Sequence, residues 1–96
     1  MSELRRAQNS GLHDYEIVDI KVNYNNANIT IMFNTPEGRK YELNIEKFIS
    51  FTISHEEVWG KGKYVCSSDV RLVNDNVYML EIELNSGDRI ITKYSK

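Results

Sequence analysis

The sequence predicts an all-β fold, either a single-domain antiparallel β-sandwich or a partly open barrel of about six to seven short strands. Three observations lead to this prediction. Apolar and polar residues alternate with a period of two along most of the chain. Turn-forming residues interrupt the alternation at intervals of about 8 to 12 residues. The length of 96 residues suits one hydrophobic core, so we expect residues 1–96 to form a single domain.

The first half of the chain predicts a three-stranded meander. Residues two apart are expected to share one face of the first strand, namely Val18, Ile20, Val22 and Tyr24. The asparagine-rich segment 25–28 predicts a turn, because asparagine tolerates positive φ. Alternation resumes over 29–33 as a second strand. The segment 35–38, Thr-Pro-Glu-Gly, predicts another turn before a third strand at 41–45.

The alternation slips between residues 45 and 49, where the apolar spacing becomes helical for a few positions. We expect a bulge or one helical turn there, which would carry the chain to the opposite sheet or round a corner. Alternation then returns as far as Ile53. A short helix in 2–9 or 45–49 is the alternative, and residues 1–11 are expected to form a flexible or short helical lead.

The clearest hairpin lies near the C-terminus. Residues 80–84 alternate, the sequence Asn-Ser-Gly-Asp at 85–88 supplies a turn, and residues 90–94 run back. We attribute the polar turn residues to the needs of the hairpin, since Gly87 can take positive φ and its neighbours can bond local backbone. Before this hairpin, a short strand is expected from Val70 to Val73.

The composition excludes several classes of protein. The single cysteine, Cys66, cannot form an internal disulfide, which disfavours a disulfide-stapled secreted scaffold. The formal net charge is −2 and no cluster of Lys and Arg exceeds a pair, so we expect no nucleic-acid partner. No apolar run reaches the length of a signal peptide or a membrane span, so we expect a cytoplasmic protein without a membrane partner.

The segment 55–64, His-Glu-Glu-Val-Trp-Gly-Lys-Gly-Lys-Tyr, resembles neither an ordinary strand nor a simple turn. Its two glycines bracket a lysine, but the full phosphate-binding pattern is absent. We interpret Trp59 as packing over the open end of the sheets above a tight glycine bend. Its neighbours are expected to form a partner-binding tip, because aromatic residues beside glycines make good interface anchors. The predicted contact residues are Trp59, Lys61, Lys63, Tyr64, Glu56 and Glu57.

The two histidines are the remaining candidates for chemistry. His13 with Asp14, and His55 with its following glutamates, could ligate zinc or hold a ligand. Neither has the local spacing of a zinc motif, so we expect solvated histidines and no metal or cofactor. Asp14 is expected to accept hydrogen bonds from nearby backbone amides. Cys66 is expected to be a small buried hydrophobe, since no base or oxyanion arrangement is visible around it.

Three phrases together resemble a known group of proteins. They are Leu-His-Asp-Tyr-Glu-Ile at 12–17, Glu-Glu-Val-Trp-Gly-Lys-Gly at 56–62 and Ile-Glu-Leu-Asn-Ser-Gly-Asp-Arg-Ile at 82–90. This combination is similar to small bacterial β-domain proteins, some of them similar to immunity proteins of polymorphic toxin systems. The resemblance implies an all-β fold, a toxin or other effector as protein partner, and no catalytic residue. The near balance of charge departs from a strongly acidic immunity protein.

These observations leave three hypotheses of function. The first is an immunity-type or antagonist protein that inhibits a partner through a sheet face and the 55–64 segment. The second is a small-molecule binder with its ligand at the sandwich mouth near Trp59, Tyr64 and His55. The third is a small hydrolase or metal enzyme, which requires at least two chemically active side chains to converge, drawn from His13, Asp14, His55, Glu56 and Cys66. A homodimer through a strand edge is compatible with each.

Overall fold

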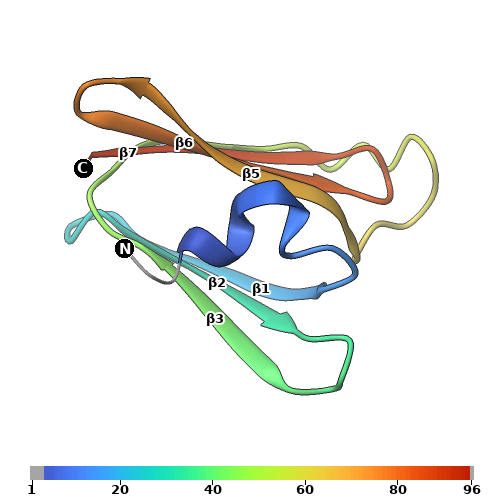
Figure 1. Cartoon of the computed structure of the whole chain (residues 1–96). Coiled ribbons are helices and arrows are strands. Elements are labelled where there is room, and N and C mark those ends of the chain that lie inside the picture. The colour runs from blue at the N-terminus through green and yellow to red at the C-terminus, as the bar shows by residue number, and fades with distance from the viewer. Residues whose placement is uncertain (1–3, 96) are drawn as a thin grey trace.

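The computed structural model describes residues 4–95 and shows seven antiparallel strands in two sheets, which confirms the predicted fold class (Figure 1). One sheet has three strands in the order β1-β2-β3, and the other has four in the order β4-β7-β6-β5. The two sheets do not close into a barrel. The strands are β1 (Glu16–Asn23), β2 (Asn28–Asn34), β3 (Lys40–Ile45), β4 (Phe48–Ile53), β5 (Val65–Asn74), β6 (Val77–Leu84) and β7 (Arg89–Ser95).

The core forms where the inner faces of the two sheets meet. Alternate residues of β2 are fully or almost fully buried, and the same holds for the second half of β3, as the period-two pattern predicts. In the other sheet, β6 and β7 contribute alternate residues in the same way. The buried side chains from these four strands are Ile29, Ile31, Phe33, Leu43, Ile45, Leu80, Ile82, Leu84, Ile90, Thr92 and Tyr94.

The chain crosses from one sheet to the other between β3 and β4, where the alternation slips. β3 ends at Ile45 and β4 begins at Phe48 in the opposite sheet. Lys47 lies between them with a φ of 57°, and the amide of Phe48 donates to the carbonyl of Ala27. The predicted change of sheet is therefore confirmed, without a helix. A bulge follows at Ile49, whose side chain is 55% exposed.

The predicted face of the first strand is wrong at both ends. β1 carries a bulge between Ile17 and Asp19, so two residues oppose one on β2. The bulge takes Val18 out of phase with Ile20, which pairs with the buried Ile31, and leaves Val18 56% exposed. Tyr24 lies beyond β1 in the turn and is 83% exposed.

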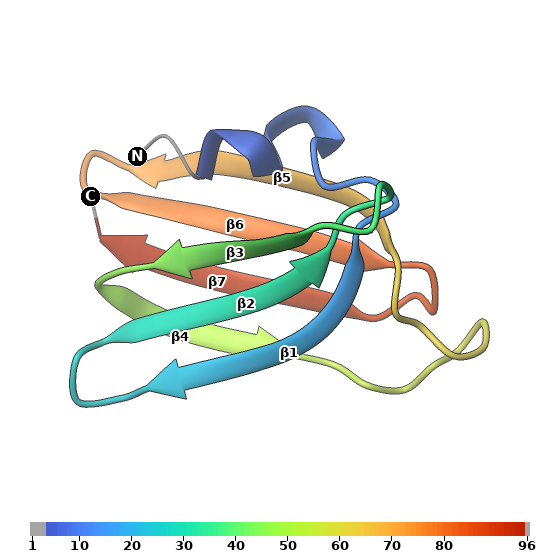
Figure 2. The same cartoon turned by 90° about the horizontal axis from the view of Figure 1, so that it is seen from below.

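The N-terminal lead is helical and covers one side of the sandwich (Figures 1 and 2). It forms η1 (Leu4–Ser10), a 3-10 segment kinked at Gln8 and Asn9, which packs beside β5. Ala7 and Leu12 are fully buried, and the amide of Leu12 donates to the hydroxyl of Ser68 on β5. Burial of a leucine side chain contributes roughly 1.5–3 kcal/mol. η1 therefore closes the core between β5 and the three-stranded sheet.

The two sheets are also joined at one end. The amide of Ile17 donates to the carbonyl of Lys63 at 2.6 Å, and the amide of Val65 donates to the carbonyl of Tyr15 at 2.8 Å. These bonds connect the start of β1 to the start of β5, with Glu16 and Tyr64 forming an isolated bridge. The segment between β4 and β5 is thereby anchored at its C-terminal end.

Candidate functional site

The candidate site is the long connection from β4 to β5, residues 54–64, which we call the 54–64 loop. Figure 2 shows it extending from one end of the sandwich, beside the turn that joins β6 to β7. This turn comprises residues 85–88, Asn-Ser-Gly-Asp, and we call it the NSGD turn. The two segments are bonded to one another at five backbone amides of the loop.

Asp88 holds the first part of the 54–64 loop. Its carboxylate accepts hydrogen bonds from the amides of Glu56 at 2.6 Å and Glu57 at 3.0 Å, and from the hydroxyl of Ser54 at 3.1 Å. The hydroxyl of Ser86 donates to the same carboxylate at 2.7 Å. The Ser86 bond, followed by the Glu56 amide, lowers the pKa of Asp88 to about 2, because these donors favour the ionised form. Asp88 is only 3% exposed.

The rest of the NSGD turn holds the second part of the loop. The carbonyl of Ser86 accepts from the amide of Trp59, and the side-chain oxygen of Asn85 accepts from the amides of Lys63 and Tyr64. A Cβ at Gly62 would lie 2.1 Å from the hydroxyl oxygen of Ser86, so glycine is required for this close approach. Both parts of the loop are therefore attached to the hairpin.

The tip of the loop is apolar and exposed. Val58 is 66% exposed and Trp59 is 74% exposed. The indole lies over the backbone of Gly87, where a Cβ would come 3.0 Å from the ring. The interpretation of Trp59 as a side chain packed over the open end of the core is therefore wrong, because one face of the ring rests on the NSGD turn and the remainder faces solvent. Gly60 makes the expected bend, with a φ of 104°.

Charged residues border this apolar tip. The ammonium of Lys63 lies 3.2 Å from the carboxylate of Glu16, whose other oxygen accepts from the side-chain amide of Asn34. The Asn34 bond and then Lys63 lower the pKa of Glu16, while Glu16 raises the pKa of Lys63. Lys63 also lies 5.5 Å from the ring centroid of Tyr64. Among the described residues Lys61 is exposed and has no ion pair, so its charge remains available to a partner.

The predicted histidine sites are two separate exposed pairs. His13 lies 3.3 Å from Asp14, and His55 lies 3.9 Å from Glu57. Within residues 4–95, no group of three or more His, Cys, Asp and Glu side chains is placed to hold a metal ion. Both histidines are solvated, as predicted, since their side chains are 58% and 79% exposed.

Two smaller predictions in this region are wrong. The carboxylate of Asp14 pairs with His13 instead of accepting from backbone amides, while the backbone of Asp14 takes a φ of 69° and donates its amide to the carbonyl of Val65. Cys66 is exposed, because it is the extra residue of a bulge between Val65 and Ser67 in β5.

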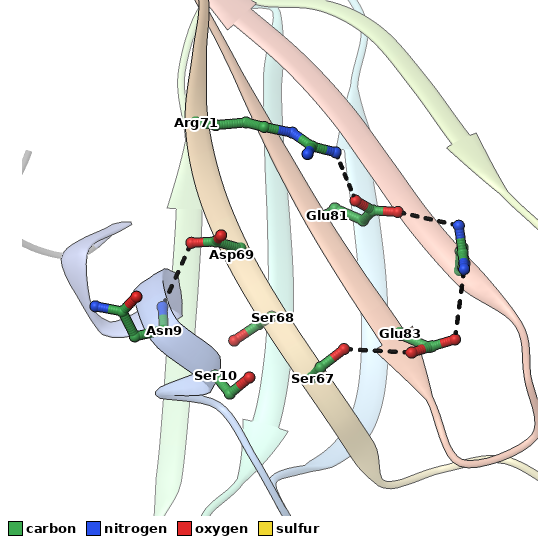
Figure 3. Close-up of a pocket in the computed structure, with 9 residues that line it drawn as sticks. Asn9, Ser10, Ser67, Ser68, Asp69, Arg71, Glu81 and Glu83 are labelled. Atoms are coloured by element: carbon green, nitrogen blue, oxygen red, sulfur yellow. Dashed lines mark hydrogen bonds and ion pairs between the residues drawn. The ribbon is translucent and has the colours of Figure 1, made fainter.

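A second candidate surface is a polar hollow of about 480 Å³ on the outer face of the four-stranded sheet, bordered by the C-terminal part of η1 (Figure 3). Glu81 links Arg71 at 2.8 Å to Arg89 at 3.3 Å, and Arg89 reaches Glu83 at 3.6 Å. Both cations are thus neutralised within the hollow. Asp69 accepts from the amide of Asn9 at 3.4 Å and pairs with no cation in the described chain.

A shallower hollow of about 240 Å³ lies on the outer face of the three-stranded sheet. Its lining includes Val18, Met32 and Glu42. Trp59 and His55 line neither this hollow nor the polar one. The two hollows therefore do not correspond to the predicted ligand position at the mouth of the sandwich.

Sequence reasoning missed the residues that position the 54–64 loop, namely Asn85, Ser86 and Asp88. In the sequence, the residues of the NSGD turn are accounted for by the needs of a hairpin. Only the fold brings this turn beside the 54–64 loop, which lies about 30 residues earlier. The available signal was an excess of polar side chains, since a hairpin turn needs one residue at positive φ but does not need three further hydrogen-bonding side chains.

No segment among residues 4–95 is a helix long and apolar enough to cross a membrane. Comparison of the chain with protein-family models, with curated proteins and with solved structures found no match.

Proposed function

We propose that the chain is a non-catalytic binding module and that the tip of the 54–64 loop is its main contact with a protein partner. The observation that carries the proposal is the pair Val58 and Trp59, which are apolar, adjacent and mostly exposed. They stand on a loop whose backbone is bonded to the NSGD turn through Asp88, Ser86 and Asn85. Exposed apolar groups on a fixed support are typical of interaction sites.

Pre-organisation of the 54–64 loop favours binding through its tip. A flexible loop loses conformational entropy when it binds, whereas a loop already fixed by hydrogen bonds loses less. Tryptophan is enriched among the residues that contribute most to interface affinity, because it buries a large area with few rotatable bonds. Trp59 has one face on Gly87 and presents the other to solvent. Docking of this face into an apolar pocket would bury it without reshaping the loop.

The form of binding suggested by the resemblance is inhibition, as in an immunity-type protein that neutralises a toxin or another effector. The charged border of the tip supports recognition of a partner with mixed charge. Lys61 is free of ion pairs in the described chain, while Glu56 exposes its side chain and uses only its amide in the loop. Such rim charges contribute mainly to specificity and association rate. The second contact area in this proposal is the outer face of β5, β6 and β7, which carries the polar hollow and its ion pairs.

The enzyme and small-molecule hypotheses have less support. Among the described residues, neither histidine pair belongs to a group of three or more His, Cys, Asp and Glu side chains placed to hold a metal ion, and Cys66 is exposed on β5. A ligand at the mouth would need an apolar cavity with a few converging polar groups. The larger hollow is instead polar, and the charged side chains that line it form ion pairs with one another.

The proposal is tested by capture with matched variants. Tagged wild-type protein, Trp59→Ala and Tyr24→Ala are used to capture proteins from lysates of the host and of its competitors, with quantification by mass spectrometry. Tyr24 is the control because it is also an aromatic residue, is 83% exposed and lies in the β1–β2 turn, which is at the other end of the sandwich (Figure 2). We expect one stoichiometric partner that is retained by Tyr24→Ala and lost by Trp59→Ala.

Two results would contradict the proposal. One is a partner that both variants capture as well as the wild type, because the tip would then not be the contact surface. The other is loss of the partner in Trp59→Ala together with loss of cooperative melting, because the effect would then reflect unfolding.

A further inference from the structure

The outer edge of β1 differs from the other three sheet edges. The edge of β5 is covered by η1, and β3 is bordered by the same helix through Arg6, which lies 4.5 Å from the ring centroid of Tyr41. β4 has an open edge, but its sequence Phe-Ile-Ser-Phe-Thr-Ile carries no charge. The first two residues of β1 bond to Lys63 and Tyr64 of the 54–64 loop, and its edge is open from Val18 onward.

The open stretch has a self-complementary order of charge. Residues 18–22 are Val-Asp-Ile-Lys-Val, with one acid and one base placed symmetrically about Ile20. In an antiparallel pair of two such strands centred on Ile20, Asp19 of each copy lies directly opposite Lys21 of the other. Opposite charges in directly facing positions stabilise antiparallel pairs, whereas like charges destabilise them. Neither Asp19 nor Lys21 forms an ion pair in the described chain.

We infer that two copies of this chain associate through β1, in antiparallel register about Ile20. The two three-stranded sheets then join into one six-stranded sheet across a two-fold axis, a closed and isologous arrangement. This inference is independent of the proposed function, because β1 and the tip of the 54–64 loop are different surfaces. The dimer would carry two loops and two possible contact sites.

The exposed apolar residues of β1 favour the same arrangement. Val22 follows Lys21 on the face that carries Ile20 and is 48% exposed, while Val18, at the bulge, is 56% exposed on the opposite face. The approach of a second strand removes part of this apolar surface from water. The Asp19 carboxylate also accepts from the amide of Ile20 at 2.9 Å, so its oxygen protects this edge donor in the monomer. On association that amide would exchange to a carbonyl of the partner copy, which leaves the carboxylate free for Lys21.

The β4 edge provides less basis for a specific dimer. Its apolar and hydroxyl side chains would tolerate several registers, because no charged pair selects one of them. On β1 the order acid-apolar-base selects a single antiparallel register. The distinction is testable because only the β1 arrangement depends on the signs of residues 19 and 21.

The experiment measures the dimerisation constant by sedimentation equilibrium at low ionic strength. Asp19→Lys and Lys21→Asp each place like charges opposite one another at two symmetric positions, and each should weaken the homodimer at least about tenfold. The double variant Asp19→Lys/Lys21→Asp restores opposite charges and should return to within about threefold of the wild type. A mixture of the two single variants should form a heterodimer at least about tenfold tighter than either homodimer.

Matched charge reversals on β3 serve as controls. Glu42→Lys and Lys40→Asp make the same changes in net charge at exposed residues on the other edge of the same sheet. Both should dimerise as the wild type does. A wild type that remains monomeric at the highest soluble concentration overturns the inference. It is also overturned if the β1 reversals leave the dimer unchanged, if the mixture shows no heterodimer, or if the β3 reversals weaken the dimer equally.

Discussion

The NSGD turn and the tip of the 54–64 loop are neighbours with opposite character. Two polar side chains of the turn are buried, with Ser86 1% and Asp88 3% exposed. The tip is apolar yet exposed, with Val58 66% and Trp59 74% exposed. This reverses the usual distribution of polar and apolar side chains. The difference shows that the two regions have separate roles. Buried polar groups of the turn fix the backbone of the loop, and the apolar side chains at the tip of the loop remain available for contact.

The largest expected effect is loss of the Asp88 carboxylate. Asp88→Asn removes the charge that draws two backbone amides and two hydroxyls together, so the loop would lose its main attachment. We expect the thermal midpoint to fall by about 12 °C, and amide exchange at Glu56 and Glu57 to become fast. Asp75→Asn, at an exposed turn residue, is the matched control. Unchanged exchange at both glutamates would contradict the attachment.

A smaller effect is expected where the loop backbone approaches the turn. Gly62→Ala forces a methyl group into the position of the Ser86 side chain, and we expect a loss of about 2 kcal/mol in the free energy of unfolding. Gly60→Ala meets no atom within 4 Å and costs only the strain of its positive φ, about 1 kcal/mol. Urea denaturation of both variants measures the difference. Equal losses would argue against close contact between loop and turn.

Acid should weaken the turn before it affects the tip. The pKa of Asp88 is lowered from 3.8 to about 2 on folding, so the ionised carboxylate contributes stability that is fully present above its unfolded pKa. This contribution declines as the pH falls from about 4 towards 2. Stability measured against pH should therefore fall over this range in the wild type, with a shallower fall in Asp88→Asn. Parallel curves for the two proteins would contradict the assignment.

The smallest effect on stability is expected at Trp59. Because the side chain is 74% exposed, Trp59→Ala should change the free energy of unfolding by less than about 1 kcal/mol. A tryptophan packed in a core would cost about 3 to 5 kcal/mol. Thermal melting distinguishes the two values. A large drop would show that Trp59 supports the fold and would remove the contrast between turn and tip.

The local pattern of residues predicts most of the fold, because alternation and turn chemistry act over a few neighbours. It predicts the β6–β7 hairpin and the change of sheet near Lys47. It fails at Val18, where a bulge with no sequence signature shifts the phase of the strand. It also fails at Asp88, whose partners in the 54–64 loop lie 31 to 34 residues away and become visible only when the two segments meet in space.

The exposure of Trp59 could not be predicted for a related reason. A lone tryptophan beside two glycines is compatible with a side chain packed in the core and with one exposed to solvent. Which of the two occurs depends on the residues that the indole contacts. Here the support is Gly87, a residue without a side chain, so the indole rests on backbone outside the core.

Trp59 is exposed in the free protein, and we propose that a protein partner buries it. Trp59 is the only tryptophan in the chain, so protein labelled with fluorotryptophan gives one fluorine NMR resonance from this side chain. We predict a strong solvent-isotope shift of the resonance in the free protein, which disappears when the captured partner is added in stoichiometric amount. Binding of the partner with the resonance and its solvent-isotope shift unchanged would contradict the account.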